Sequence, residues 1–193
     1  MELSPILYHR LIRPDWFLER YIFSKLKDNF EFNNKKIIDF GCGVGSSSAF
    51  FPSSSYLGLD CDKRRVEYAR KTNPGYDFGE LVGNKLPVPD ASVDYILIVS
   101  VLHHIPSKDV HEYLNEFRRV LTNSGKILVI EPCLFKSSYL SNCYMSWFDK
   151  GKYIRNEDEY LDMFVNFNYQ TQVMRRFSQL FVYKKLFFVA FPN

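Results

Sequence analysis

An acidic residue followed by three glycines at alternate positions gives this chain its first group with chemical potential. The stretch reads Ile37-Ile38-Asp39-Phe40-Gly41-Cys42-Gly43-Val44-Gly45. Its apolar residues predict a short buried strand, and the glycines predict a tight turn in which the backbone passes close to a ligand. The N–H groups of such a turn suit a carboxylate, and Asp39 can bind an ammonium group or the turn's own N–H groups. We expect a helix to begin between Ser46 and Phe51.

The pattern Asp-x-Gly-x-Gly-x-Gly resembles motif I of the class I S-adenosylmethionine-dependent methyltransferases, type 11-like. The resemblance implies that the turn, with Gly41, Cys42, Gly43 and Gly45, holds the methionine end of S-adenosyl-L-methionine. The alternative is a dinucleotide fingerprint, Gly-x-Gly-x-x-Gly. That pattern needs a glycine where Ser46 stands, so it fits less well.

A second strand, Tyr56-Leu57-Gly58-Leu59-Asp60, also ends on an acid. In the resembled fold a carboxylate about twenty residues after the glycine turn binds the ribose hydroxyls, which assigns that role to Asp60. The alternative for Asp60 is a second capping or surface acid. Asp62 is expected to cap the following helix, and Cys61 is placed to touch the adenine ring.

The adenine contact is the least defined part of the predicted cofactor site. Members of the family often carry an acidic residue a few positions before a Leu-Pro pair, but no acid occupies the matching place before Leu86-Pro87. We therefore assign the adenine contact to the backbone at Leu81 or Val82, with Asn84 as an alternative.

The second match covers residues 86–105, from Leu86-Pro87-Val88-Pro89-Asp90 through a buried strand at Tyr95–Val99 to Leu102-His103-His104. Ser100 to His104 follow the carboxyl end of that strand, where open α/β sheets bind ligands. Ser100 is assigned to the cofactor. Either His103 or His104 could act as a general base, and the alternative is a histidine packed under the site. Methyl transfer from a sulfonium needs alignment more than acid–base help.

A third match consists of a helix capped by Ser107, a turn at 122–125, a strand at 126–130 and then Glu131-Pro132-Cys133. Glu131 is expected at the carboxyl edge of the sheet, either facing the acceptor or as a rim carboxylate. Cys133 after proline resembles the cysteine of cytosine-5 methylation only faintly, because Glu131 precedes it as in small-molecule enzymes.

The flanking segments are expected to define the acceptor. Residues 1–35 predict helices that cap the cofactor, with side chains that could reach it at Tyr8, His9, Arg10, Arg13 and Trp16. Residues 134–155 predict an irregular aromatic segment, which serves either as a wall of the acceptor site or as a patch over the sheet edge. The wall would be formed by Tyr139, Tyr144, Trp147, Phe148 and Tyr153 with Lys150, Lys152 and Arg155. Asn156 and Glu159 predict a capping box, and 170–177 with 186–191 predict a closing hairpin.

Bulk composition limits the function classes. The chain has 193 residues and a net charge of +3, which does not favour a nucleic acid or an anionic surface by electrostatics alone. Its four cysteines show no metal-binding spacing and predict reduced thiols in a cytoplasmic protein, with no metal. We find no signal-like start and no apolar run of the ~20 residues that span a bilayer.

These observations predict one α/β methyltransferase domain over 1–193. Its core, 36–133, would be Rossmann-like and doubly wound, within a seven-stranded, mostly parallel sheet that has one antiparallel strand near the C-terminus. The predicted reaction is methyl transfer to a small-molecule, lipid-linked or glycan-linked acceptor, and a nucleic acid is disfavoured. Two alternatives remain: a nicotinamide-dependent oxidoreductase, and a non-catalytic cofactor-binding or partner protein.

Overall fold

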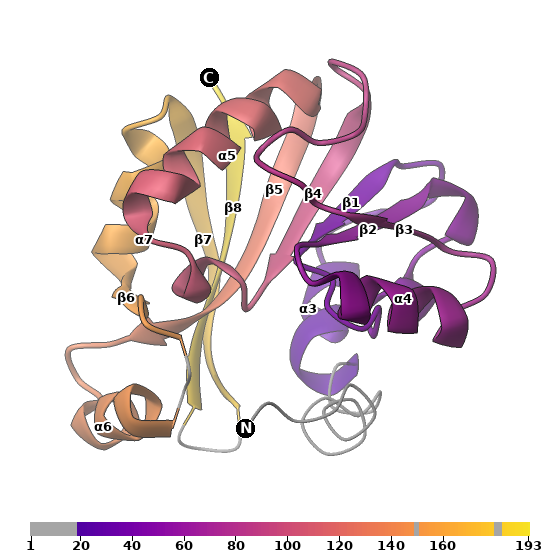
Figure 1. Ribbon diagram of the computed structural model, residues 1–193. Coiled ribbons are helices and arrows are strands. Elements are labelled where there is room, and N and C mark those ends of the chain that lie inside the picture. The colour runs from indigo at the N-terminus through magenta and orange to yellow at the C-terminus, as the bar shows by residue number, and fades with distance from the viewer. Residues whose placement is uncertain (1–18, 149–150, 180–182) are drawn as a thin grey trace. The chain divides into compact units, whose positions relative to one another are not determined.

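The structure is a computed structural model that describes residues 19–148, 151–179 and 183–193. The chain forms two compact units, one up to Gly83 and one from Asn84 onward. Figure 1 labels the elements of both. The N-terminal residues expected to reach the cofactor, Tyr8 to Trp16, lie outside the described part.

The first unit is a small parallel sheet with helical turns. A π-helix at Glu19–Phe23 runs into α3 (Ser24–Lys27), and both bury apolar side chains. The strands are β1 (Ile37–Phe40), β2 (Tyr56–Asp60) and β3 (Asp77–Glu80). They pair in parallel in the order β3-β2-β1, and α4 (Lys63–Thr72) connects β2 to β3. Because β1 and β2 are parallel neighbours, their carboxyl ends lie at one edge of the sheet, where Asp39 and Asp60 are found.

The helix expected from Ser46 to Phe51 does not form. Turns follow the glycines, and only a 3₁₀ turn at Ser48–Phe50 appears. Consecutive serines have weak helix propensity, and Pro52 prevents the chain from continuing as a helix. The segment is instead held by aromatic packing, because the Phe50 ring stacks on Phe23 and Phe51 packs against Tyr56.

The second unit holds a mixed sheet. The strands β4 (Val93–Val99), β5 (Leu121–Leu134), β8 (Tyr183–Pro192) and β7 (Tyr169–Gln179) are neighbours in that order. β4 and β5 are parallel, and β8 is antiparallel to both β5 and β7, so the predicted antiparallel strand and closing hairpin are confirmed. The two-residue β6 (Arg155–Asn156) also pairs with β5, which brings the strands of the described residues to eight instead of seven.

The helices of this unit are α5 (Ser107–Val120), α6 (Tyr139–Phe148) and α7 (Glu157–Val165). The predicted capping box is confirmed, since Asn156 accepts from the Glu159 N–H and Glu159 accepts from the Asn156 N–H. Ser107 is the first residue of α5 and Pro106 occupies the cap position, so the predicted cap was wrong by one residue. The turn predicted at 122–125 does not separate from β5. These residues belong to the strand, and the register of its pairing with β4 shifts there.

The prediction of an irregular segment at 134–155 was wrong, because α6 lies within it. Among residues 139–147 of this helix, Ser141 and Met145 are the buried ones, one turn apart, so the packed side of that stretch is narrow. A sequence pattern that predicts a helix from its buried stripe has little to detect here.

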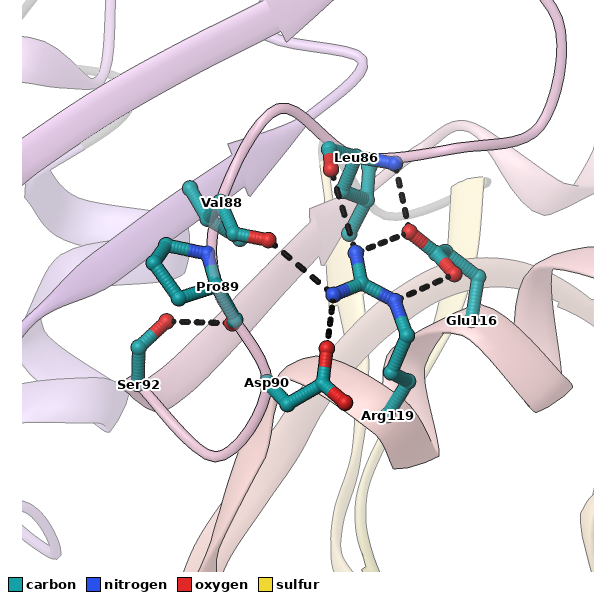
Figure 2. A network of polar contacts seen from close by, with 7 residues as sticks. All are labelled: Leu86, Val88, Pro89, Asp90, Ser92, Glu116 and Arg119. Carbon is teal, nitrogen blue, oxygen red and sulfur yellow. Dashed lines mark hydrogen bonds and ion pairs between the residues drawn. The ribbon is translucent and has the colours of Figure 1, made fainter.

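A charged network fixes the loop that leads into β4. The Arg119 guanidinium on α5 donates to the Leu86 and Val88 carbonyls (3.2 and 3.1 Å) and to Asp90 (2.5 Å), and it pairs with Glu116 (Figure 2). Glu116 also accepts from the Leu86 N–H at 2.6 Å. The Leu-Pro-to-Asp stretch of the second motif is therefore anchored to α5 by its backbone.

Candidate functional site

The glycine turn is held against the end of β2 by its own N–H groups. Those of Gly41 and Cys42 donate to the Leu59 carbonyl at 2.7 and 3.0 Å, and that of Gly43 donates to Asp60 Oδ2 at 2.8 Å. The Gly45 N–H bonds the Cys42 carbonyl. The turn is thus preformed, and a ligand carboxylate at these positions would share donors that already have protein acceptors.

The glycines of the turn meet different surroundings, although all three have positive φ. A Cβ at Gly45 would lie 2.7 Å from the Phe78 ring, so this position is needed for packing. A Cβ at Gly43 would meet nothing within 4 Å. The space beside Gly43 is therefore open on the side from which a ligand can approach the backbone.

Asp60 is buried, and its carboxylate binds both the glycine turn and the residue that caps α4. Its Oδ2 accepts from Gly43 and its Oδ1 accepts from the Asp62 N–H at 2.8 Å. Each carboxylate oxygen has two lone pairs, so this arrangement leaves acceptor capacity on both. Asp62 caps α4 by accepting from the Arg64 N–H, as predicted, and the neighbouring Cys61 is exposed.

Asp39 lies in the interior at the end of β1. The Tyr56 hydroxyl donates to its Oδ2 at 2.7 Å, and Asp39 is 2% exposed. Burial, and then the charge of Asp39, raise the pKa of the Tyr56 hydroxyl. The same causes raise the pKa of the buried Cys42 thiol, so Cys42 is a packed neutral side chain in this turn.

The predicted adenine-side residues differ from one another in exposure. Leu81 is buried and its N–H donates to the Asp60 carbonyl at 2.9 Å, which extends the chain alongside β2. Val82 is 76% exposed. Asn84, the alternative, belongs to the second unit, where its side chain donates to Glu112.

In the second unit Ser100 follows β4 in a strained conformation. Its φ is +58°, unusual for a residue with a side chain. Its hydroxyl accepts from Lys185 Nζ at 2.7 Å, and Lys185 on β8 is 3% exposed. The sequence analysis missed Lys185, because a lysine beside an apolar strand gives no signal until the pairing of β8 with β5 is known.

His103 and Glu131 form a buried pair. Glu131 Oε2 lies 2.7 Å from His103 Nδ1, and Glu131 Oε1 accepts from the Val101 and Leu102 N–H groups at 2.6 and 2.9 Å. Burial raises the pKa of Glu131, but His103 and the two N–H groups outweigh it, so the pKa lies below its ordinary value. An ionised carboxylate only accepts, which assigns the Nδ1 proton to His103 and leaves Nε2 as an acceptor in the neutral ring.

Arg155 fixes the loop that carries the histidines. Its guanidinium donates to the Leu102 and Ile105 carbonyls, both at 2.8 Å, and to Ser107 Oγ at 3.0 Å. Arg155 is buried and therefore serves this loop, not the acceptor wall to which the sequence assigned it. His104 is exposed, with its ring 4.0 Å from that of His103.

Other reactive groups in the described residues do not form a second centre. Cys133 is fully buried, and burial raises the pKa of its thiol to about 12, so a thiolate nucleophile is disfavoured there. Within the described ranges no group of three His, Cys, Asp or Glu side chains is arranged to hold a metal ion. No helix among the described elements is long and apolar enough to cross a bilayer.

Comparison with solved structures defines the class of fold. A SAM-dependent methyltransferase from Aquifex aeolicus superposes with a TM-score of 0.71, covering 97% of this chain and 99% of that one at 18% identity. The predicted Rossmann-like, mostly parallel α/β fold is thereby confirmed.

Sequence comparison gives the family. Residues 38–129 match the family model described as "Methyltransferase domain". The demethylmenaquinone methyltransferase of Chlorobaculum parvum is 28% identical over 116 residues, 58% of this chain and 47% of that protein. The fatty-acid O-methyltransferase of Mycolicibacterium smegmatis is 31% identical over 100 residues, 49% of this chain and 36% of that protein. A tRNA (carboxymethyluridine(34)-5-O)-methyltransferase of Saccharomyces cerevisiae is 28% identical over 93 residues, 48% of this chain and 33% of that protein.

The core of this chain, residues 38–129, matches the methyltransferase family, its fold is that of a class I S-adenosylmethionine-dependent methyltransferase, and S-adenosylmethionine is the cofactor of such enzymes. The match is confined to the core, since the chain spans about half the length, or less, of the curated relatives it matches.

Proposed function

We propose that this chain transfers a methyl group from S-adenosylmethionine to a small-molecule, lipid-linked or glycan-linked acceptor. The observation that carries the proposal is the Asp60 carboxylate, locked to the Gly43 N–H while retaining lone pairs for a vicinal diol. The open space beside Gly43 supports the same assignment for the methionine end. Both features suit a nucleoside with a short charged tail.

The cofactor, when bound, supplies a methyl group already activated on a sulfonium. The chain's own residues would therefore mainly bind, orient and exclude water. In this proposal Asp60 binds the ribose, the glycine turn binds the methionine end, and Asp39 balances its ammonium group. Leu81 and Val82 border the adenine together with Cys61. Ser100, in the second unit, is assigned to the cofactor by its place in the sequence motif alone.

His103 is proposed to accept the acceptor's proton at Nε2. Glu131 holds Nδ1 and supports the charge that would form on the ring, as a carboxylate does for a catalytic histidine. The exposed His104 is the second candidate for this role. This function applies to a hydroxyl or amine acceptor, because such groups lose a proton when they are methylated.

The choice of acceptor class rests on charge and on the relatives. Two relatives act on a menaquinone precursor and on fatty acids by name, and one acts on tRNA. The net charge of +3 gives little electrostatic attraction for RNA, which favours the small or lipid-linked acceptor.

The test is a methyl-transfer assay with S-adenosylmethionine labelled in its methyl group. Quinols, long-chain fatty acids, sugar-linked lipids and bulk tRNA would be offered separately, with product followed by extraction into organic solvent or by precipitation. We expect label in an organic-soluble product that disappears in Asp60→Asn. Label found only in tRNA would refute the acceptor class. Tight cofactor binding without turnover on any class would favour the non-catalytic alternative.

A further inference from the structure

The helix α6 turns an apolar face outward. Trp147 is 87% exposed, Leu140 82%, Tyr139 78% and Tyr144 42%. These positions follow the spacing i, i+1, i+5 and i+8, which places them on one side of a helix. Ser141 and Met145, on the opposite side, are buried. The helix therefore exposes a large apolar face in addition to the side that packs against its unit.

The outward face has the composition of a membrane-interface surface. Tyrosine and tryptophan combine an apolar ring with a polar tip and are enriched at the boundary between lipid and water. No residue from Tyr139 to Phe148 is charged. In Figure 1 the helix lies at one end of its unit, past β6, where it contacts β5 and β8. The side of α6 that carries Tyr139, Leu140 and Trp147 therefore faces solvent.

Basic residues flank the helix on both sides. Lys136 precedes it and Lys152 follows it, and both are exposed. Lys136 lies 3.8 Å from Asp158, but both side chains are largely in solvent, so this pair leaves the ammonium group accessible. Apolar insertion with lysines at its edges is the arrangement that binds anionic lipid surfaces.

The size of the face argues against a stable protein interface as its occupant. Ten residues of helix are about 15 Å long. A standard interface buries about 800 Å² on each partner, more than four side chains on such a helix supply. A bilayer needs no such area, because a short apolar face can insert among the headgroups.

We propose that α6 docks this protein on an anionic lipid bilayer, with Trp147, Leu140 and Tyr139 inserted at the interface. This docking is separate from methyl transfer and is measured without cofactor or acceptor. It would bring the chain to acceptors that reside in a membrane.

The test uses the full chain and phosphatidylcholine vesicles, with or without phosphatidylglycerol, in a flotation assay. We expect binding that is stronger with phosphatidylglycerol and weakened about tenfold by each of Leu140→Ser and Trp147→Ser, the loss that follows from removing one large apolar side chain. Val165→Ser, which removes an exposed apolar side chain from α7, is the matched control and should bind like the wild type.

A second readout keeps the proposal testable if the variants fold poorly. The chain has two tryptophans, Trp16 and Trp147, so Trp16→Phe leaves Trp147 as the only reporter. Its emission should shift to shorter wavelength and be quenched by brominated lipid. The proposal is overturned if the wild type does not float with vesicles, or if Trp147 stays in water when it does. It is equally overturned if Leu140→Ser and Trp147→Ser abolish self-association in gel filtration and leave flotation unchanged, which would assign the face to a second copy of the chain.

Discussion

Gly43 and Gly45 lie two positions apart in one turn, but an added side chain would meet open space at Gly43 and the Phe78 ring at Gly45. Gly45→Ala drives a Cβ into the Phe78 ring at a left-handed φ of +78°. We expect it to cost about 2–4 kcal/mol of unfolding free energy from strain and overpacking. Gly43→Ala has only the conformational penalty, about 1 kcal/mol.

Gly43→Ala, the more stable of the two variants, should bind S-adenosylmethionine more weakly than Gly45→Ala does. The methyl group of Gly43→Ala enters the open space proposed for the ligand, so S-adenosylmethionine affinity should fall at least about tenfold. Denaturant unfolding and calorimetric titration measure the two effects. If Gly43→Ala binds the cofactor as well as the wild type does, the ligand does not approach the backbone there.

The pair of His103 and Glu131 gives a kinetic prediction. Glu131→Gln removes the charge that supports a protonated ring, so kcat should fall about 10²-fold, at the low end of what general-base catalysis contributes. His103→Gln should lose as much, because it removes the base itself, and the double variant should lose no more than either single one. A folded His103→Gln variant with unchanged kcat would reduce His103 to a packing residue.

For single residues, the sequence indicated the chemical role of a side chain better than it indicated the groups with which that side chain forms hydrogen bonds. The prediction that Asp62 caps a helix is confirmed, because strand and helix signals fix its place, and the assignment of Asp60 to the ribose stays a prediction. Asp39 was expected to bind an ammonium group or the turn, and its contact with Tyr56 was missed. Arg155 and Lys185 were misassigned or missed, since their contacts with Leu102 and Ser100 join residues 53 and 85 positions apart. No local pattern carries that information.

Arg155 acts on a whole element, the loop from Leu102 to Ser107. Arg155→Met should destabilise the protein by about 2–3 kcal/mol, because the buried carbonyls and the hydroxyl that it binds lose a charged donor. Arg176→Met is the matched control, since Arg176 pairs with Glu157 at the surface and should contribute about 0–1 kcal/mol. Urea unfolding of both variants checks the contrast, and equal losses would contradict it.

The network around Arg119 predicts how stability depends on pH. The hydrogen bond from Arg119, above all, holds the pKa of Glu116 below its ordinary value of 4.5. The stabilisation by Glu116 is therefore full above that ordinary value and is lost as the pH falls through the lowered one. Glu116→Gln should cost about 1 kcal/mol at pH 7. The difference between variant and wild type should shrink progressively below pH 4.5, and a difference that is constant down to acid unfolding would contradict this assignment.

Elements with a clear buried stripe were predicted well, and elements without one were not. β4 and α5 follow from apolar periodicity, and the capping box at Asn156 follows from its spacing. α6 was missed because residues 139–147 bury only two side chains and turn their aromatic side to solvent. The helix after the glycine turn was expected from the pattern of a strand followed by a glycine turn, but Pro52 and three serines replace it with turns.

At the scale of the whole molecule, the sequence motifs identified the fold because they lie in its most constrained part. The three motifs fall between residues 37 and 133, which includes the region matched by the family model. The segments that follow, from α6 onward, carry no such motif. The acceptor therefore remains a proposal, while the match to the methyltransferase family rests on the core alone.

The central claim, that this chain binds S-adenosylmethionine through Asp60, is tested most directly by calorimetric titration. Wild type, Asp60→Asn and Asp62→Asn would each be titrated with S-adenosylmethionine, S-adenosylhomocysteine and NADH. Asp62→Asn is the matched control, because asparagine caps a helix about as well as aspartate. We predict that the wild type and Asp62→Asn bind both sulfur nucleotides alike, and that Asp60→Asn binds them about 10- to 100-fold more weakly, the loss of hydrogen bonds to a charged group. Binding of NADH alone, or equal affinity in Asp60→Asn and Asp62→Asn, would contradict the account.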